Sequence, residues 1–115
     1  MRLEQPMKRG EVWWVNFDVS VGGEIQKRRP AVIVSKDAAN ATLNRVQVVP
    51  LTSNTAKVHP GEALVSVGGK EGKAMASQLA TASKQRLGKR YATLSQPDLR
   101  AVEKAIAVQL GLRAL

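Results

Sequence analysis

The fold of this chain is decided by residues 22–53, which read GGEIQKRRPAVIVSKDAANATLNRVQVVPLTS. A cation-rich loop ends at Pro30, and an apolar segment of strand length, residues 31–34, follows at once. Because proline restricts the residue before it to extended backbone, we expect Arg29 to hold a defined position where the loop becomes a strand. A second apolar segment, residues 46–49, also ends at a proline. The stretch therefore predicts two short β strands with polar residues gathered at their ends.

Further segments of strand length lie on both sides of this stretch. Residues 11–17 carry large apolar groups on both faces, which favours a central strand or one shared with an interface. A tryptophan left exposed on one face would mark a partner site, and the equal alternative is two core tryptophans on opposite faces. Residues 62–67 alternate between apolar and polar, and residues 70–72 are expected to form a tight polar turn after them. The expected strands are residues 11–17, 31–35, 45–51, 62–67, 73–79 and 89–92, with a turn or one helical turn over residues 37–44.

One helix is predicted near the C-terminus. Ser95 and Asp98 have the spacing of a capping box, and the proline between them is tolerated only in a first helical turn. Gly111 is expected to end the helix. Apolar residues recur at helical spacing at Leu99, Val102, Ile106 and Leu110. Such a stripe is a core face, so we assign the helix no chemistry. The chain is predicted to be mainly β (α+β), a small, strongly bent barrel with a C-terminal helix.

The composition describes a single folded domain. With 115 residues and 43% hydrophobic residues, the chain can bury roughly two-thirds of its unfolded surface. We place the domain at residues 8–115 and expect residues 1–7 to form a flexible leader. The absence of cysteine excludes disulfides and thiolate metal sites and fits the cytoplasm, and His59 alone cannot build a histidine-rich metal centre. There is no apolar run of about 18 residues, hence no expected membrane span, and no signal-peptide pattern.

The charge balance is strongly basic. Lysine and arginine number 18 against 9 acidic residues, which gives a net charge of +9. This excess predicts attraction to a polyanion, either a nucleic acid or an acidic partner protein. Net charge governs association and not fold, so both kinds of partner stay open on charge alone.

The order of several short motifs resembles one known family. A G-x-E-x-x-x-x-R-P pattern is followed by an apolar strand and later by a Thr-Ser pair, and an R-G-E-V-W opening at residues 9–13 precedes them. The matching residues are Gly22, Glu24, Arg29, Pro30, Asp37, Thr52 and Ser53. This ordered set resembles the MazF/PemK (Kid) toxins, which are endoribonucleases of bacterial type II toxin–antitoxin pairs. The likeness runs from about residue 8 to residue 112.

The resemblance implies both a fold and an activity. The fold is the Src-homology-3-like barrel that MazF shares with the gyrase poison CcdB. The activity is sequence-specific cleavage of single-stranded RNA, with mRNA as the expected target, and it needs no metal or other cofactor. Cleavage of this kind requires a base for the ribose 2′-hydroxyl, neutralisation of a pentavalent phosphorane and an acid for the departing 5′-oxygen.

The resemblance also assigns roles to individual residues. Arg29 and Thr52 take the catalytic phosphate role, because the planar fork of arginine grips two phosphate oxygens and a threonine hydroxyl adds a hydrogen bond. The residues expected to bind RNA are Glu24, Lys27, Arg28, Ser53, Asn54, Lys57 and Gln78. Some relatives carry an arginine and an acid shortly before this glutamine, where Met75 and Ser77 stand here. That departure leaves the groups that carry the protons unassigned.

The resemblance also implies binding partners, and it leaves two other functions open. The resemblance implies a homodimer with an RNA groove across its interface, a small acidic MazE-like antitoxin, no membrane association and a cytoplasmic location. Two other functions stay open: a non-catalytic, CcdB-like gyrase inhibitor, and a basic nucleic-acid-binding barrel without activity. The substitution Arg29→Ala separates these classes, because it should abolish cleavage in a ribonuclease and only weaken binding in an inactive barrel.

Overall fold

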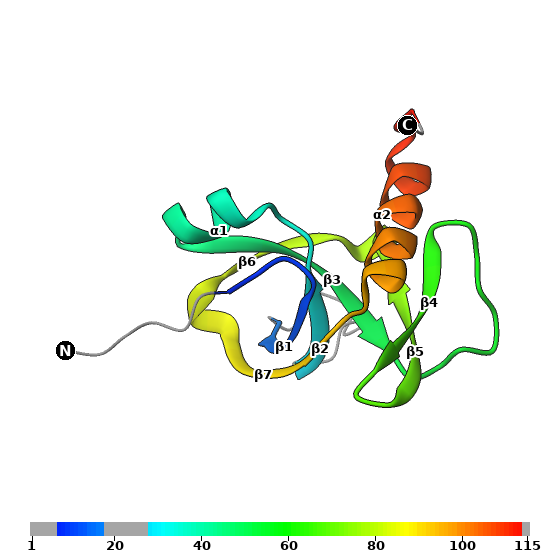
Figure 1. The fold of residues 1–115 in the computed structure, drawn as a ribbon, viewed down its shortest axis with the longest axis horizontal. Coiled ribbons are helices and arrows are strands. Elements are labelled where there is room, and N and C mark those ends of the chain that lie inside the picture. The colour runs from blue at the N-terminus through cyan, green and yellow to red at the C-terminus, as the bar shows by residue number, and fades with distance from the viewer. Residues whose placement is uncertain (1–6, 18–27, 114–115) are drawn as a thin grey trace.

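The computed structural model describes residues 7–17 and 28–113, which form a strongly curled β sheet with one long helix (Figure 1). The strands are β1 (Glu11–Asn16), β2 (Arg28–Ile33), β3 (Arg45–Thr52), β4 (Glu62–Val67), β5 (Lys70–Met75), β6 (Ala80–Ser83) and β7 (Leu87–Thr93). The helices are α1 (Asp37–Thr42) and α2 (Gln96–Leu110), with two 3₁₀ turns, η1 (Ala76–Gln78) and η2 (Lys84–Arg86). No helix within the described ranges is long and apolar enough to cross a membrane. The prediction of a mainly β chain with a C-terminal helix is confirmed.

The sheet bends around β3. The described strands are ordered β4-β5-β3-β2-β1-β7, and β6 also pairs with β3. Residues 45–48 of β3 pair with β6, whereas residues 51–52 pair with β5. Pro50 lies where β3 changes neighbours, so its missing N–H costs the ladder little and the strand continues to Thr52. The central place predicted for β1 is confirmed, because β1 lies between β2 and β7.

β2 begins earlier than the sequence predicts. Arg28, Arg29 and Pro30 already pair with β1, whereas pairing with β3 begins only at Ala31. A proline is tolerated at this position because β2 has a ladder partner there on one side only. Arg29 is therefore held inside a strand rather than at the end of a loop.

The β4–β5 hairpin turns at a glycine pair. Val67 and Lys70 are the last paired residues, and Gly68 and Gly69 between them have φ angles of +57° and +83°. Two successive positive φ angles define a tight hairpin turn that glycine adopts without steric cost. β5 therefore begins at Lys70, three residues before the predicted strand, and the polar turn predicted there is wrong.

Two apolar clusters fill the spaces on opposite faces of the sheet. The first lies toward α2 and the β4–β5 hairpin and contains Val12, Val32, Val34, Val49, Leu51, Ala63, Val65, Val67, Ala74, Ala76, Leu94, Val102 and Ala105. The second contains Trp13, Val15, Ala31, Ile33, Val46, Val48, Ala82 and Leu87. Each large aliphatic side chain removed from water in this way contributes roughly 1.5–3 kcal/mol. The clusters hold the central strands, and with them the ends of β2 and β3, in a fixed arrangement.

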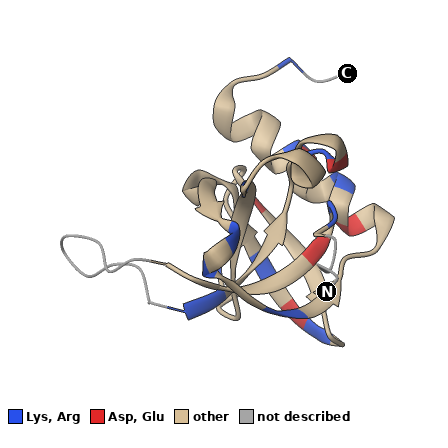
Figure 2. Cartoon of the chain, turned by 90° about the vertical axis from the view of Figure 1, so that its left-hand side faces the viewer, with Lys and Arg blue, Asp and Glu red and all other residues tan. Residues whose placement is uncertain are grey.

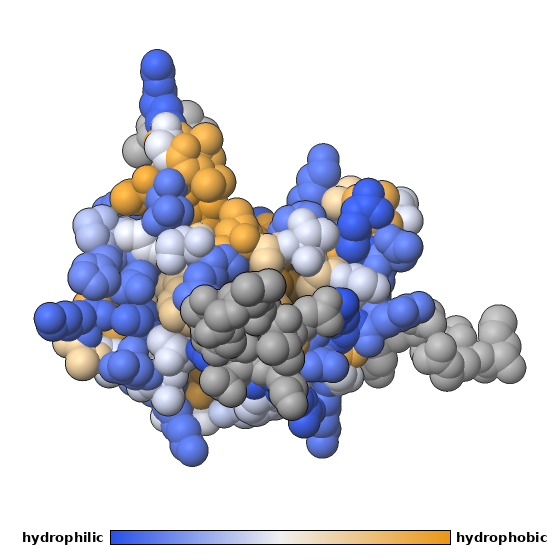
Figure 3. All heavy atoms as spheres, turned by 180° about the vertical axis from the view of Figure 1, so that it is seen from behind, coloured by the Kyte–Doolittle hydropathy of each residue, from blue (hydrophilic) through white to orange (hydrophobic). Residues whose placement is uncertain are grey.

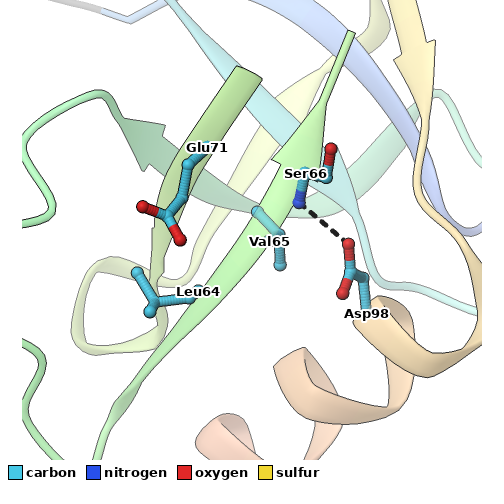
Figure 4. A pocket seen from close by; sticks show the side chains of 5 residues that line it. All are labelled: Leu64, Val65, Ser66, Glu71 and Asp98. Carbon is cyan, nitrogen blue, oxygen red and sulfur yellow. Dashed lines mark hydrogen bonds between the residues drawn. The ribbon is translucent and has the colours of Figure 1, made fainter. Parts of the chain in front are cut away.

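Helix α2 is tied to the sheet at its first turn. Ser95 Oγ accepts a hydrogen bond from the backbone N–H of Asp98 at 3.2 Å, which confirms the predicted N-cap. The Asp98 carboxylate does not complete the capping box but accepts from the backbone N–H of Ser66 at 2.8 Å (Figure 4). Ser66 belongs to the edge strand β4, so this bond joins the helix to the free edge of the sheet. Gly111, with φ of +69°, ends the helix as predicted.

The far end of α2 leaves apolar side chains uncovered. Leu99 and Val102 are buried as the predicted stripe requires, but Leu110 is 54% exposed, so its place in the core was predicted wrongly. The helix extends past the sheet that covers its first turns (Figure 1). Val108 and Leu112 are also exposed, and Figure 3 shows apolar surface gathered over this part of the molecule.

The predicted leader lies almost wholly outside the described residues. Its last residue, Met7, packs partly buried against the cluster of Trp13. The boundary proposed between leader and domain stays a prediction.

Candidate functional site

Arg29 and Thr52 lie at neighbouring strand ends. The β2–β3 register pairs Ala31 with Pro50, so continuing the same register by two residues sets Arg29 opposite Thr52. Opposite residues of an antiparallel pair point to the same face of the sheet. Arg29 Nη1 donates a long hydrogen bond of 3.5 Å to the carbonyl oxygen of Leu51, the residue before Thr52. Two residues that are 23 positions apart in the sequence are thus brought together.

The guanidinium of Arg29 is only partly exposed. Its Nε is buried and has no hydrogen-bond partner among the described residues. A buried donor left unsatisfied costs about 1–3 kcal/mol. Because the guanidinium is always protonated, it offers a permanent positive charge in a planar fork.

The loop after β3 is shaped by the side chains at its start. Thr52 Oγ1 accepts from the backbone N–H of Asn54, and Asn54 Oδ1 accepts from that of Ala56, each at 3.2 Å. The exposed Ser53 lies between them. Ser53 and Asn54, both predicted to bind RNA, therefore directly follow the candidate catalytic threonine, although the Asn54 amide oxygen already has a structural partner.

A buried lysine on β5 holds the same loop. Lys73 lies opposite Thr52 on β5 and is 9% exposed. Its Nζ donates to the carbonyl oxygen of Lys57 at 2.7 Å and lies 3.3 Å from Glu62 Oε1. That oxygen also accepts from the backbone N–H of His59 at 2.9 Å. The loop that carries the exposed Lys57 side chain is therefore pinned to β4 and β5.

The pKa of Glu62 lies below its ordinary value. The hydrogen bond from the His59 backbone N–H is the largest influence, burial acts in the opposite direction, and the bond and charge of Lys73 lower the pKa further. Glu62 is thus held as a carboxylate beside Lys73. His59 takes part through its backbone, in line with the absence of a predicted catalytic role.

A second carboxylate anchors the start of β1. Glu11 is 6% exposed and accepts from the Lys8 backbone N–H and from Trp13 Nε1, each at 3.0 Å, and from Arg90 Nη1 at 2.9 Å. Burial is the largest influence and opposes ionisation, but the three donors and the charge of Arg90 together outweigh it and lower the pKa of Glu11. This network orients Trp13 in the core and is structural.

Arg28 belongs to an aromatic cluster. Its guanidinium carbon lies 5.3 Å from the ring centroid of Trp14, and the ring of Trp14 lies 5.6 Å from that of Tyr91 with an interplanar angle of 42°. Trp14 is partly exposed and Tyr91 is 41% exposed. The partly exposed tryptophan of β1 therefore lies against both a cation and a tyrosine.

A shallow depression of about 100 Å³ connects this cluster with Thr52. Its walls come from the ends of β2 and β3, the β4–β5 hairpin and β7. The lining residues are Pro30, Leu51, Thr52, Ser53, Val67, Lys70, Glu71, Gly72 and Tyr91. The depression is therefore mostly apolar, with polar groups on its rim.

The remaining predicted site residues do not join this group. Gln78 ends η1, where its Nε2 donates to Met75 Sδ at 3.7 Å, and η1 packs against α2 and β3. Ser77 is exposed beside it. Glu24 and Lys27 lie outside the described residues. No hydrogen bond between described residues joins Gln78 to Arg29 or Thr52, and its role stays a prediction.

Basic residues are spread over several elements rather than placed on one face of a helix (Figure 2).

Across residues 7–17 and 28–113, no three His, Cys, Asp or Glu side chains gather in a group that could hold a metal ion. Besides the open pocket beside Asp98, a wider apolar pocket of about 440 Å³ lies between β4 and α2.

Three residues near the site were not singled out from the sequence as site residues: Trp14, Lys73 and Tyr91. The alternation of β1 indicated a tryptophan on each face but not which one would stay exposed. Lys73 follows a glycine in a polar segment and carries no mark of burial. Tyr91 reaches the site only because β7 closes the curl of the sheet.

Comparison with known proteins agrees with these observations. Residues 8–110 match the family of PemK-like, MazF-like toxins of type II toxin–antitoxin systems. The endoribonuclease MazF9 of Mycobacterium tuberculosis is 38% identical over 92% of this chain and 98% of its own length. The endoribonuclease toxin MazF of Escherichia coli is 30% identical over 89% of this chain and 92% of its own.

Solved structures share the fold. The crystal structure of MazF from Deinococcus radiodurans has a TM-score of 0.80 at 27% identity and covers 95% of this chain and 100% of its own. A MazE–MazF complex of the same organism has a TM-score of 0.75 at 26% identity, over 96% of this chain and 100% of that one. By its sequence over nearly its whole length and by its fold, the chain belongs to the PemK-like, MazF-like family of type II toxin–antitoxin toxins.

Proposed function

We propose that this chain is the toxin of a type II pair and acts as a sequence-specific, metal-independent endoribonuclease on single-stranded RNA, with mRNA as its target. The observation that carries the proposal is the meeting of Arg29 and Thr52 at neighbouring strand ends, with the Arg29 guanidinium against the backbone of Leu51. The relatives named as endoribonucleases support it.

In the proposed reaction the ribose 2′-hydroxyl attacks the adjacent phosphorus and the bond to the 5′-oxygen breaks. Negative charge grows on the phosphoryl oxygens of the pentavalent phosphorane. The Arg29 guanidinium, which carries a permanent positive charge in a planar fork, binds these oxygens. Losing one preorganised donor of this kind costs roughly 2.7–4 kcal/mol in the transition state.

Thr52 adds the second contact. Its hydroxyl accepts from the Asn54 N–H, which leaves its own hydrogen free to donate to a phosphoryl oxygen. The Lys73–Glu62 pair holds the loop after Thr52, so the hydroxyl keeps its orientation. These residues bind and stabilise the anion, and the groups that carry the protons stay unassigned.

RNA binding outside the catalytic pair is proposed for a set of cations and polar groups, of which Arg28 begins β2 and Ser53, Asn54 and Lys57 follow β3. Arg28 and Lys57 contact phosphates, Ser53, Asn54 and Gln78 contact base edges, and Glu24 and Lys27 are also assigned to RNA binding. The net charge of +9 supports attraction to the RNA backbone.

We also propose the assembly and location implied by the family. The toxin forms a homodimer, binds a small acidic MazE-like antitoxin and works in the cytoplasm. The apolar residues left exposed at the end of α2, Val108, Leu110 and Leu112, supply surface that a protein partner would cover. The complex of MazE with MazF in Deinococcus radiodurans supports the antitoxin partner.

The decisive experiment incubates purified protein with a long RNA in EDTA, beside Arg29→Ala and a control, Arg45→Ala. Arg45 is exposed at the opposite end of β3, and its side chain donates to Asn44 Oδ1 at 3.1 Å. We expect discrete cuts with the wild-type protein and the control, and a rate lower by about 10²–10³-fold in Arg29→Ala.

Three outcomes would contradict the proposal. Cuts that vanish in EDTA would exclude a metal-independent reaction. Cuts that form in Arg29→Ala at the wild-type rate would exclude its catalytic role. RNA left intact by every protein would favour the CcdB-like or binding-only alternatives, and inhibition of gyrase would then be measured.

A further inference from the structure

We propose that Trp14, Tyr91 and Arg28 form a stacking subsite for one base of the RNA, beside the Arg29–Thr52 pair. The inference rests on the proposed ribonuclease function and adds to it the residues that hold a nucleotide next to the scissile phosphate.

The cluster has the composition of a base-binding surface. Arg28 lies over the Trp14 ring at 5.3 Å, and Tyr91 lies against the same ring at 5.6 Å. Tyr91 is nevertheless 41% exposed, so one side of the stack is open. Single-stranded RNA is commonly bound by stacking its splayed bases on aromatic rings and guanidinium planes. These three residues therefore offer a surface on which one base can stack.

The tyrosine ring is held in place from two sides. Trp14, on β1, contacts the ring. A Cβ built on Gly68 would lie 3.3 Å from the Tyr91 hydroxyl oxygen, so the phenol also packs against the β4–β5 turn. β7 and β4 are at opposite ends of the strand order. The side chain thus spans the opening of the curled sheet, and a ring fixed in this way loses little conformational entropy when a base stacks on it.

The depression beside Tyr91 suits a nucleotide. Ser53, Lys70 and Glu71 lie on its rim and Tyr91 forms a wall. Its apolar floor comes from Pro30, Leu51 and Val67. The flat face of a base would stack on the Tyr91 ring over the apolar floor. Its polar edge would lie near the Ser53 hydroxyl, and the adjacent phosphate would lie near the Lys70 ammonium group.

The depression reaches Thr52, one member of the catalytic pair. Thr52 is one of its lining residues, and Pro30 and Leu51 are the chain neighbours of Arg29 and Thr52. Strand alternation points the side chains of Arg29 and Pro30 to opposite faces. An RNA strand that crosses the ends of β2 and β3 would place its scissile phosphate at Arg29 and a neighbouring base against Tyr91.

Charge favours RNA over an apolar protein segment as the occupant. Arg28 and Lys70 flank the rings, and the whole chain carries a net charge of +9. A polyanion with stackable bases satisfies both the cations and the rings. Docking of a protein segment at the same surface is the competing outcome of the test.

The test measures binding of an RNA that carries the mapped cut site, with a 2′-deoxyribose at the cleaved nucleotide to prevent cleavage. Single abasic substitutions are placed at each position in turn. In the wild-type protein, one position next to the cut should weaken binding by about 5- to 140-fold. In Tyr91→Ala the intact RNA should bind that much more weakly, and the abasic substitution at the same position should have no further effect. Tyr91→Phe, which keeps the ring, should bind within about twofold of the wild type.

Leu64→Ala is the matched control, because Leu64 is 42% exposed on β4 and outside the depression. Its RNA affinity should not change. Thermal unfolding checks the fold of each variant, and Tyr91→Leu, which keeps apolar contact with Trp14 but cannot stack, replaces the alanine variant if that variant does not fold.

The proposal is overturned if the abasic penalty persists in Tyr91→Ala, or if that variant binds intact RNA as the wild type does. Unchanged RNA binding with lost antitoxin binding would identify a protein-docking surface instead. Failure of the proposed ribonuclease function would give a different result, because the wild-type protein would then leave RNA intact. In that case binding would be measured on unmodified single-stranded RNA. Weaker binding by Tyr91→Ala than by the wild type would still support the subsite.

Discussion

The guanidinium of Arg29 lies against the backbone of Leu51, with Nη1 3.5 Å from the carbonyl oxygen of the residue that precedes Thr52. This contact crosses the end of the β2–β3 ladder, beyond its last paired residues, Ala31 and Pro50. Both side chains are thus carried by strands that the apolar core holds rigidly. A site built on strand ends keeps its geometry better than one built on loops, which is the requirement for stabilising a short-lived phosphorane.

Removing the Thr52 hydroxyl should slow cleavage. In Thr52→Val the contact to the phosphoryl oxygen is lost while the shape is kept, and a hydrogen bond to a charged group is worth about 1.5–3 kcal/mol, or about 10- to 150-fold in rate. Thr52→Ser keeps the hydroxyl and the bond from the Asn54 N–H and should stay close to the wild-type rate. Single-turnover cleavage measures the effect, and equal rates for the valine and serine variants would rule out the assigned contact.

Breaking the Lys73–Glu62 pair should loosen the loop after β3. In Lys73→Met the Lys57 carbonyl and the Glu62 carboxylate lose a donor, and each poorly solvated polar group left unsatisfied costs about 1–3 kcal/mol. Urea unfolding should show this loss of stability, whereas Lys89→Met, at an exposed position on β7, should leave the midpoint unchanged. A variant as stable as the wild type would mean that water replaces the lysine at no cost.

Stability should fall in acid because of Glu11 and Glu62. Both carboxyl groups have pKa values below the ordinary 4.5 in the folded protein, so the unfolded chain binds protons first as the pH drops. Their contribution is complete above the ordinary pKa and is lost as the pH falls through the lowered values. Urea midpoints recorded from pH 7 downward should therefore decline below about pH 4.5. Glu62→Gln should be less stable than the wild type near neutrality, and the difference should shrink in acid; a constant difference would show that ionisation of Glu62 does not matter.

The first turn of α2 should depend on its cap. Ser95→Ala removes the acceptor for the Asp98 N–H and should lower the free energy of unfolding by about 0.5–2 kcal/mol. Ser83 makes a similar bond to Gln85 N–H at 3.2 Å, but it caps a single 3₁₀ turn. Ser83→Ala should therefore cost less, and chemical denaturation of the two variants in parallel tests this order.

The exposed Lys57 should contribute to RNA affinity through charge. Lys57→Gln should bind single-stranded RNA more weakly and lower the slope of log K against log salt by about 0.7, the value for one phosphate contact. Lys36 is also exposed but lies beyond the opposite end of β2. Lys36→Gln should leave the slope as it is, and equal slopes for both variants would place Lys57 away from the RNA.

The sequence by itself determined the elements of this protein and the family to which it belongs. Alternation gave the bounds of β4 without error, and Ser95 and Gly111 marked the ends of α2, because these signals act between residues a few positions apart. The ordered motifs around Arg29 and Thr52 were sufficient to recognise the family. Local patterns failed where a neighbouring strand decides: Arg28 already belonged to β2, and Lys70 began a strand instead of a turn.

Only the tertiary structure decided what surrounds the candidate site. The burial of Lys73, the exposure of Leu110 and the position of Tyr91 against Trp14 depend on which strands and helices cover them. No periodicity in the sequence contains that information, because β7 meets the β4–β5 turn only when the whole sheet curls. Local sequence patterns therefore specify the strands. Long-range packing closes the sheet and decides which residues line the site.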